Sequence, residues 1–249
     1  MKKLVVGNWK MNPESLTDAK NIAGEVKRNM AKVKKTDVVL CPPFVYLPSL
    51  SSVPKGSLFL GAQDAFYESM GHFTGEVSSS QLPQFKVRFV IVGHSERRKI
   101  GESDDVVNKK AKAVVGDGMT AIVCVGESVR DHHGEYFDFI RNQILSALKD
   151  IPKKWLERVV IAYEPIWAVG AKEAMSPQDL HETSIFIRKV LVDQFGPFAS
   201  DIRILYGGDA DRVNSDKLVR DGNVSGLLVG RESLKAKDFV EIIKLVDAL

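Results

Sequence analysis

Eight short and almost purely apolar runs recur along the chain. They cover residues 4–6, 38–40, 58–60, 89–92, 121–125, 159–163, 202–206 and 227–229. The runs are rich in Val, Ile and Leu, and they lack the alternation of apolar and polar positions that marks a strand with one solvated face. The pattern therefore predicts eight strands of a parallel sheet that is buried on both faces.

Amphipathic helical patterns separate these runs. Apolar side chains recur at steps of three or four in residues 16–33 and again in residues 239–246, which places them on one face of a helix. Each strand with its following helix takes about 31 residues on average, the size of a unit in which a crossover helix leads to the next parallel strand. Eight such units predict an α/β fold, a closed (β/α)8 barrel with eight parallel strands that forms a single domain over residues 1–249.

The alternative fold is a doubly wound open sheet. Such a sheet usually carries a Gly-rich GxGxxG fingerprint after its first strand. The first apolar run leads instead into Gly7, Asn8, Trp9 and Lys10. The barrel is therefore favoured.

Composition limits the partners and the compartment. The 35 Lys and Arg residues against 32 Asp and Glu residues give a net charge of +3, which is too small to indicate a nucleic-acid or membrane surface. Cys41 and Cys124 lie far apart without CxxC or Cys/His spacing, so they indicate a reducing compartment and neither a disulfide framework nor a zinc site. No apolar stretch approaches the ~18 residues that span a bilayer. We expect a cytoplasmic protein with no nucleic-acid or membrane partner.

Polar residues and glycines directly follow the predicted strands, where the reactive groups of a (β/α)8 barrel lie. They are Asn8, Lys10, Gln63, His94, Glu164, Gly207, Gly208 and Gly230. Glu164, which precedes Pro165, is either a general base or a salt-bridged strand end. His94 stands at the start of a predicted helix, where free N–H groups favour a neutral imidazole that can donate to a carbonyl oxygen; a lone His there is otherwise structural.

The combination of these groups indicates one class of reaction. A carboxylate base, a neutral donor and the cation Lys10, beside glycine-lined loops that can present N–H groups to a phosphate, suit proton abstraction next to the carbonyl of a small phosphate ester. His132 and His133 are adjacent, so they face different ways and make poor joint metal ligands. The chain has no GxSxG or Walker sequence, so covalent and nucleotide chemistry are not indicated.

Three longer strings resemble the triosephosphate isomerase family closely. They are GNWKMN at residues 7–12, VGHSERR at residues 92–98 and AYEPIWAVG at residues 162–170. Three shorter strings, CVGE at 124–127, YGG at 206–208 and LVG at 228–230, fall in family order at family spacing. The resemblance therefore runs the length of the chain.

The resemblance implies that the chain interconverts dihydroxyacetone phosphate and D-glyceraldehyde 3-phosphate through an enediolate, in glycolysis and gluconeogenesis, with no metal or organic cofactor. It implies that Glu164 moves the proton between C1 and C2 and that neutral His94 polarises the carbonyl and shuttles hydroxyl protons. Lys10 would stabilise negative charge on oxygen, Asn8 would help to orient the oxygens, and Glu96 would support Lys10 or its neighbours.

The resemblance also implies a lid that closes over the substrate, from Pro165 toward Ser176. The expected lid residues are Pro165, Ile166, Trp167, Ala168, Val169, Gly170, Ala171, Lys172, Glu173, Ala174 and Met175. Residues 171–175 replace the more usual Thr-Gly-Lys-Thr-Ala series of the family. Because only Gly populates positive φ freely, the loss of the lid-tip glycine predicts a stiffer lid.

The segment at residues 64–79 is long for a barrel connection, which suggests a binding loop. Its GHFTGE string at residues 71–76 resembles the intersubunit loop of the family. The resemblance implies a homodimer in which Thr74 enters the site of the neighbouring subunit. A subunit interface also explains the apolar Phe66, Tyr67, Met70 and Phe73 in this loop.

The chain departs from the family around the substrate phosphate. The residues expected to bind substrate are Asn8, Lys10, Gly170, Asp209, Gly230 and Arg231. Asp209 stands where the family usually has Ser, and Arg231 stands where it usually repeats Gly. One hypothesis is that Arg231 neutralises Asp209, or binds the phosphate while Asp209 turns away; neutral drift with the backbone contacts kept is the alternative.

Two other functions remain open at this stage. The first is an isomerase that acts on a different small phosphosugar, because the residues near the phosphate are the ones that changed. The second is a non-catalytic phosphate-binding dimer. The intact acid–base set favours an active triosephosphate isomerase over both.

Overall fold

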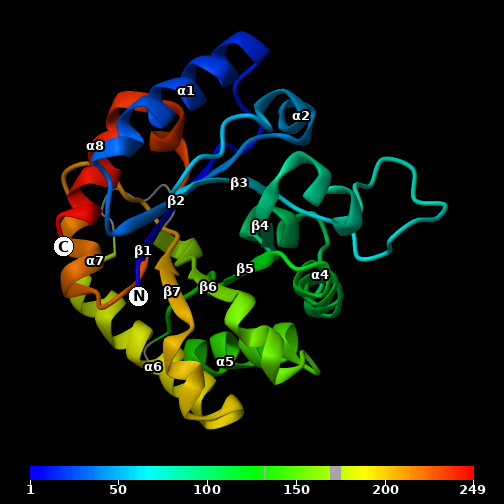
Figure 1. The fold of residues 1–249 in the computed structure, drawn as a ribbon. Helices are drawn as coiled ribbons and strands as arrows, with labels where there is room; N and C mark the ends of the chain where they lie inside the picture. The colour runs from blue at the N-terminus through cyan, green and yellow to red at the C-terminus, as the bar shows by residue number, and fades with distance from the viewer. Residues whose placement is uncertain (132, 169–174) are drawn as a thin grey trace.

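The computed structural model describes residues 1–131, 133–168 and 175–249. Eight parallel strands pair in sequence order, and β8 pairs with β1, so the sheet closes into a barrel (Figure 1). The strands are β1 (Lys3–Asn8), β2 (Thr36–Cys41), β3 (Leu58–Ala62), β4 (Val87–Val92), β5 (Thr120–Val125), β6 (Val159–Tyr163), β7 (Arg203–Tyr206) and β8 (Gly226–Val229). The predicted (β/α)8 barrel is confirmed.

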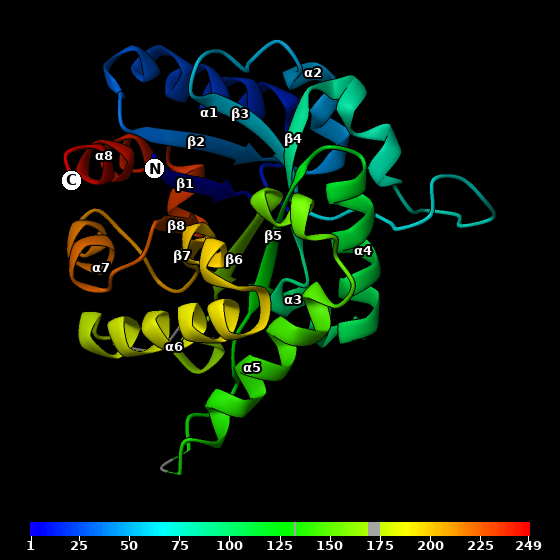
Figure 2. The same cartoon turned by 60° about the horizontal axis from the view of Figure 1, so that its bottom comes forward.

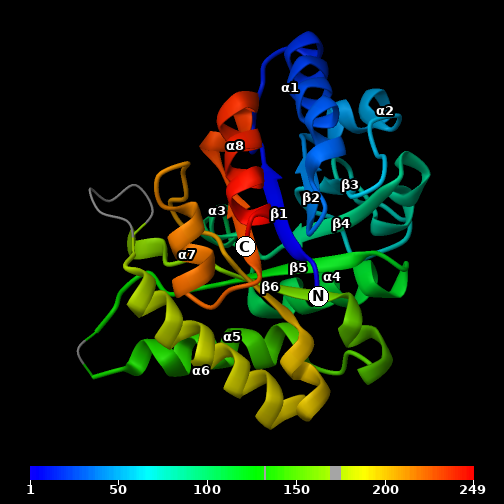
Figure 3. The same ribbon diagram turned by 60° about the vertical axis from the view of Figure 1, so that its left-hand side comes forward.

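Helices surround the barrel on its outer face (Figures 2 and 3). They are α1 (Leu16–Asn29), α2 (Leu47–Leu50), α3 (Ser95–Lys99), α4 (Asp104–Gly116), α5 (Glu135–Leu148), α6 (Pro177–Phe195), α7 (Ser215–Asp221) and α8 (Ala236–Asp247). Short 3-10 helices include η3 (Ser79–Gln81), η6 (Ile166–Ala168) and η8 (Arg231–Leu234). No helix in the described ranges has the length and apolar character needed to cross a bilayer.

Each strand is buried on both of its faces. One set of side chains fills the barrel interior, and the alternate set packs against the surrounding helices. The interior set is Leu4, Val6, Val39, Cys41, Phe89, Ile91, Ile122, Cys124, Val160, Ala162, Leu205 and Leu228. Because both sets are apolar, the strands appear in the sequence as continuous runs.

The end of the chain is tied to the start of β2. The Asp247 carboxylate accepts hydrogen bonds from the backbone N–H groups of Lys34, at 3.0 Å, and Lys35, at 2.7 Å. Burial raises the pKa of Asp247, but these hydrogen bonds outweigh burial and hold the pKa below its usual value. The two chain ends lie near each other in Figures 1 and 3.

The segment at residues 64–79, which follows β3 and runs into the start of η3, projects from the side of the barrel (Figures 1 and 2). Its apolar side chains gather on one another: the Phe66 ring lies 4.3 Å from that of Tyr67 and 4.6 Å from that of Phe73, between ring centroids. Met70 and Phe73 remain 86% and 43% exposed. The projecting loop therefore offers apolar surface that its own barrel does not cover.

Candidate active site

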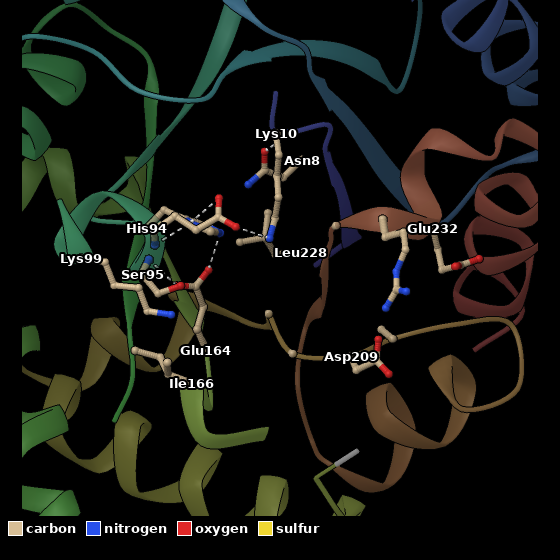
Figure 4. A pocket seen from close by; sticks show the side chains of 16 residues that line it. Asn8, Lys10, His94, Ser95, Lys99, Glu164, Ile166, Asp209, Leu228 and Glu232 are labelled. Carbon is tan, nitrogen blue, oxygen red and sulfur yellow. Dashed lines mark hydrogen bonds and ion pairs between the residues drawn. The ribbon is translucent and has the colours of Figure 1, made fainter. Parts of the chain in front are cut away.

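Glu164 follows β6 directly, and its carboxylate is 3% exposed. Its Oε2 accepts a hydrogen bond from the backbone N–H of Ser95 at 2.9 Å, and its Oε1 lies 3.0 Å from His94 Nε2 (Figure 4). A Cβ atom at Gly207 would come within 2.9 Å of Glu164 Cγ, so the glycine after β7 leaves room for this side chain. The fold thus holds a buried carboxylate against an imidazole.

His94 caps the first turn of α3. Its Nδ1 accepts from the backbone N–H of Glu96 at 3.2 Å, so Nδ1 carries no proton in this hydrogen bond. The proton of the neutral ring is then on Nε2, which faces Glu164. His94 is therefore arranged as a neutral hydrogen-bond donor that points into the site.

Lys10 has a φ of +53°, in the left-handed region that non-glycine residues rarely occupy. Two side chains hold this backbone: Asn8 Oδ1 accepts from the Lys10 N–H at 3.0 Å, and Gln63 Nε2 donates to the Lys10 carbonyl oxygen at 2.8 Å. Surrounding structure must compensate for such strain, which costs of order 1–3 kcal/mol. The constraint fixes the direction in which the Lys10 side chain leaves β1.

The Lys10 ammonium is 2.7 Å from Glu96 Oε1. Burial raises the pKa of Glu96, but the hydrogen bond and the charge of Lys10 outweigh it and leave the pKa below its usual value. Glu96 is therefore ionised at neutral pH and balances the charge of Lys10. The two residues therefore form a direct ion pair inside the pocket.

These groups line one pocket of about 250 Å³ at the carboxyl ends of the strands. Acid–base groups lie on one side of it, and Asp209 and Glu232 lie on the other (Figure 4). The loops that follow β7 and β8 also line the pocket, with Gly207, Gly208, Ala210, Gly230 and Arg231. A base, a neutral donor and a cation around a volume of this size suit proton transfer on a molecule of a few carbon atoms.

The first part of the predicted lid is anchored by Glu127, which follows β5. Glu127 Oε1 accepts from Trp167 Nε1 at 2.7 Å, within η6, and from the Tyr163 hydroxyl at 2.9 Å. Burial raises the pKa of Glu127 above its usual value. Of the expected lid residues, Val169, Gly170, Ala171, Lys172, Glu173 and Ala174 lie outside the described residues.

A family model described as triosephosphate isomerase matches residues 3–246. The chain belongs to the triosephosphate isomerase family.

Relatives named triosephosphate isomerase match almost end to end. The protein from Idiomarina loihiensis is 38% identical over 243 residues, which is 96% of each chain. The protein from Endomicrobium trichonymphae is 38% identical over 246 residues, which is 98% of each chain. The protein from Clostridium botulinum is 39% identical over 244 residues, which is 96% of this chain and 98% of the relative.

With the family established, the expected site residues can be placed. Asn8, Lys10, His94, Glu96 and Glu164 all line the one pocket, as do Asp209, Gly230 and Arg231. Thr74 lies in the exposed part of the projecting loop and is not among the residues that line this pocket. The adjacent pair His132–His133 has its first member outside the described residues.

One hypothesis about the phosphate region concerns Asp209 and Arg231. Neutralisation of Asp209 by Arg231 requires an ion pair, and among the described residues neither side chain has an ion-pair partner within 4.0 Å, although both line the pocket. Both residues are solvent-exposed. An exposed ion pair gains only about 0–1 kcal/mol over the two charges hydrated separately, so little free energy draws these two side chains together.

Three contacts of the site have little or no signal in the residue pattern of the sequence. The backbone N–H of Ser95 holds Glu164, but an N–H group leaves no mark in a residue pattern. Gln63 is a polar residue at a strand end, and this position is the only signal in the sequence for its hydrogen bond to the Lys10 backbone. Glu127 lies two residues beyond the end of β5, after Gly126, and that position near a strand end is the only signal for its anchoring of Trp167.

Proposed function

We propose that this chain is a triosephosphate isomerase that interconverts dihydroxyacetone phosphate and D-glyceraldehyde 3-phosphate, in glycolysis and gluconeogenesis. The observation that carries the proposal is the distance of 3.0 Å between Glu164 Oε1 and His94 Nε2, in the pocket that Lys10 also lines. Family membership over residues 3–246 supports the same activity. The substrate is a small phosphorylated triose.

The geometry supports a division of roles in the reaction. Glu164 takes a proton from one carbon of the substrate and returns it to the neighbouring carbon, so one carboxylate serves both directions. His94 donates its Nε2 proton to the carbonyl oxygen, where negative charge develops, and takes a proton back from the neighbouring hydroxyl group as the new carbonyl forms. The ammonium of Lys10 stabilises the same negative charge. Asn8 holds the Lys10 backbone, and it would orient the oxygens of the substrate. Glu96 keeps Lys10 in position.

Substrate binding requires an exchange of partners at His94. In the free pocket Nε2 of His94 is 3.0 Å from Glu164. The substrate carbonyl takes over the Nε2 hydrogen bond, which frees Oε1 of Glu164 to accept a proton from carbon. The hydrogen bond from the Ser95 N–H to Oε2 keeps the carboxylate oriented meanwhile.

The glycine-lined side of the pocket is the place we propose for the phosphate, next to Gly230, Asp209 and Arg231. The lid from Pro165 to Met175, with Gly170 at the substrate, would close over it and exclude water. Trp167 and Glu127 would hold the hinge at its start.

We also infer one domain over residues 1–249, because β1 and β8, from opposite ends of the chain, pair to close the barrel. A cytoplasmic location is supported by Cys41 and Cys124, which are buried and unpaired.

A coupled assay on glyceraldehyde 3-phosphate tests the activity. We expect a kcat/KM of at least about 10⁵ M⁻¹s⁻¹, an ordinary value for an enzyme. Turnover of a larger phosphosugar with none of the triose would favour the alternative isomerase. Absence of turnover with retained binding of 2-phosphoglycolate would favour the non-catalytic dimer.

The projecting loop supports a homodimer in which Thr74 completes the site of the neighbour. Met70 and Phe73 are apolar and exposed close to Thr74 in this loop. A second copy that covers these side chains would remove them from water, which is the principal driving force of association.

Replacing Phe73 by Asp should weaken the dimer at least about thirtyfold, because a charge would replace an aromatic anchor of the interface. Sedimentation equilibrium over a range of protein concentrations measures this, and turnover should fall as monomer accumulates. Ile185→Asp is the control, since Ile185 is 51% exposed on α6. A Phe73→Asp protein that sediments as the wild type would contradict the assignment of this loop to the interface.

A further inference from the structure

The pocket carries more negative than positive charge, although its proposed substrate is a dianion. Among the described residues that line it, the ionisable side chains are three cations and four carboxylates, which leaves a formal charge of −1 when His94 is neutral. They are Lys10, Lys99, Arg231, Glu96, Glu164, Asp209 and Glu232. A phosphate dianion can enter this field only where a cation is free to meet it, because like charges a few ångströms apart repel by several kcal/mol in a partly buried site.

Three of these charges are already balanced. Lys10 pairs with Glu96 at 2.7 Å, and Glu232 pairs with Lys235 at 2.9 Å. Within residues 1–131, 133–168 and 175–249, neither Lys99 nor Arg231 has a carboxylate within 4.0 Å. From its described residues, the pocket thus offers two unpaired cations to a ligand.

These two cations lie on opposite sides of the pocket. Lys99 ends α3, which follows β4, and lies on the side of Glu164 and Ile166 (Figure 4). Arg231 begins η8, which follows β8, directly after Gly230. Since β4 and β8 are four strands apart in a ring of eight, Arg231 lies across the barrel mouth from Lys99.

Asp209 stands on the same side as Arg231, in the loop that follows β7. Its backbone oxygen accepts from Asn214 Nδ2 at 3.2 Å, while its carboxylate has no ion pair among the residues described. Figure 4 shows Asp209 on the side of the pocket opposite Glu164. An unbalanced carboxylate and an unbalanced guanidinium therefore flank the same glycine-lined space.

We propose that Arg231 binds the substrate phosphate through its guanidinium group, and that Asp209 weakens the same binding by charge repulsion. The two side chains act on the ligand and not on each other. The planar guanidinium suits two parallel hydrogen bonds to phosphate oxygens. The inference rests on the proposed function, and it assigns the affinity for the phosphate group to the balance of these two opposed charges.

Four variants and two ligands test the proposal: Arg231→Gln, Asp209→Asn, the double variant and Lys99→Gln, each titrated by calorimetry with inorganic phosphate and with 2-phosphoglycolate. Arg231→Gln should weaken both ligands at least tenfold, and Asp209→Asn should strengthen both about threefold or more. The double variant should show close to the product of the two changes, since the side chains are not ion-paired. Lys99→Gln removes the other unpaired cation and should weaken binding less than threefold.

A fifth variant, Arg231→Lys, separates binding from folding. It keeps the charge and loses the planar fork, so it should recover part of the lost affinity. A change of less than twofold in Arg231→Gln would overturn the proposal, and so would an equal loss in Lys99→Gln. A loss in Arg231→Gln that disappears in the Asp209→Asn background would show neutralisation instead.

These binding measurements test the role of Arg231 independently of the proposed isomerase activity, because calorimetry requires no turnover. A wild-type protein that binds phosphate through Arg231 but does not isomerise the triose would contradict only the proposed function. A wild-type isomerase whose Arg231→Gln variant keeps its phosphate affinity and its KM would contradict only the role of Arg231.

Discussion

Replacement of Glu164 by Gln should lower kcat on glyceraldehyde 3-phosphate by about 10³- to 10⁴-fold, the contribution of a well-placed general base. The amide has the shape of the carboxylate, and its oxygen can still accept from the Ser95 N–H, which now lies 2.9 Å from Oε2. The amide cannot take a proton from carbon at neutral pH. The variant should therefore fold and bind but not turn over, as measured by the coupled assay beside calorimetry with 2-phosphoglycolate.

Glu232→Gln is the matched control for this loss. Glu232 also lines the pocket, and the same chemical change there removes only its pairing with Lys235 at 2.9 Å. We expect kcat to stay within about threefold of the wild type, since an exposed ion pair contributes about 0–1 kcal/mol. Activity of Glu164→Gln within tenfold of the wild type would contradict the role of Glu164 as the base.

The sequence was sufficient to predict the barrel, because its strands are buried on both faces and contrast sharply with the amphipathic helices between them. It was less informative about strand ends. The first apolar run covers residues 4–6, whereas β1 extends over Lys3–Asn8, where Asn8 still pairs in register with Cys41 of β2. Polar residues at a strand end interrupt the apolar pattern in the sequence, but their backbone groups can still form the hydrogen bonds of the sheet.

The site was predictable to the extent that its residues follow strands. Parallel strands in a closed barrel bring their carboxyl ends to one mouth, so Lys10, His94 and Glu164 had to be neighbours. The exact positions of their side chains depend on backbone features that the residue types do not reveal. Examples are the Ser95 N–H that binds Glu164 and the left-handed backbone of Lys10. Whether Asp209 and Arg231 form an ion pair was not predictable from the sequence either. Exposed charged side chains gain little free energy from pairing over hydration by water, so the residue types alone do not decide between the two.

The second large effect is expected at a buried charge cluster beneath the projecting loop. Lys110 on α4 is 2% exposed, and its ammonium is 2.8 Å from each carboxylate oxygen of Asp64 and also bonds Glu102. Arg97 Nε lies 2.8 Å from both Asp64 Oδ2 and Glu102 Oε1. Burial raises the pKa of Asp64 above its usual value, whereas for Glu102 the hydrogen bonds from Lys110 and Arg97 outweigh burial and lower the pKa.

Lys110→Met should reduce the free energy of unfolding by about 3–5 kcal/mol near neutral pH, because it leaves two buried carboxylates to share one cation. The loss should be smaller at pH 5. The folded-state pKa of Asp64 is already above its unfolded value and rises further without Lys110, so the folded variant takes up a proton as the pH falls and recovers stability. Urea unfolding at pH 5 and pH 7.5 measures both effects, at one fixed protein concentration because a dimer gains stability with concentration.

Lys109→Met provides the control from the next position of the same helix. Lys109 is exposed, and its ammonium lies 5.1 Å from the centre of the Tyr67 ring, a contact of about 0.5–1 kcal/mol at an exposed site. Its loss should be of that size and independent of pH. If Lys110→Met costs no more than Lys109→Met, the buried carboxylates are not held by Lys110. If the cost of Lys110→Met grows as the pH falls, Asp64 does not take up the proton, because protonation there can only reduce the unbalanced charge.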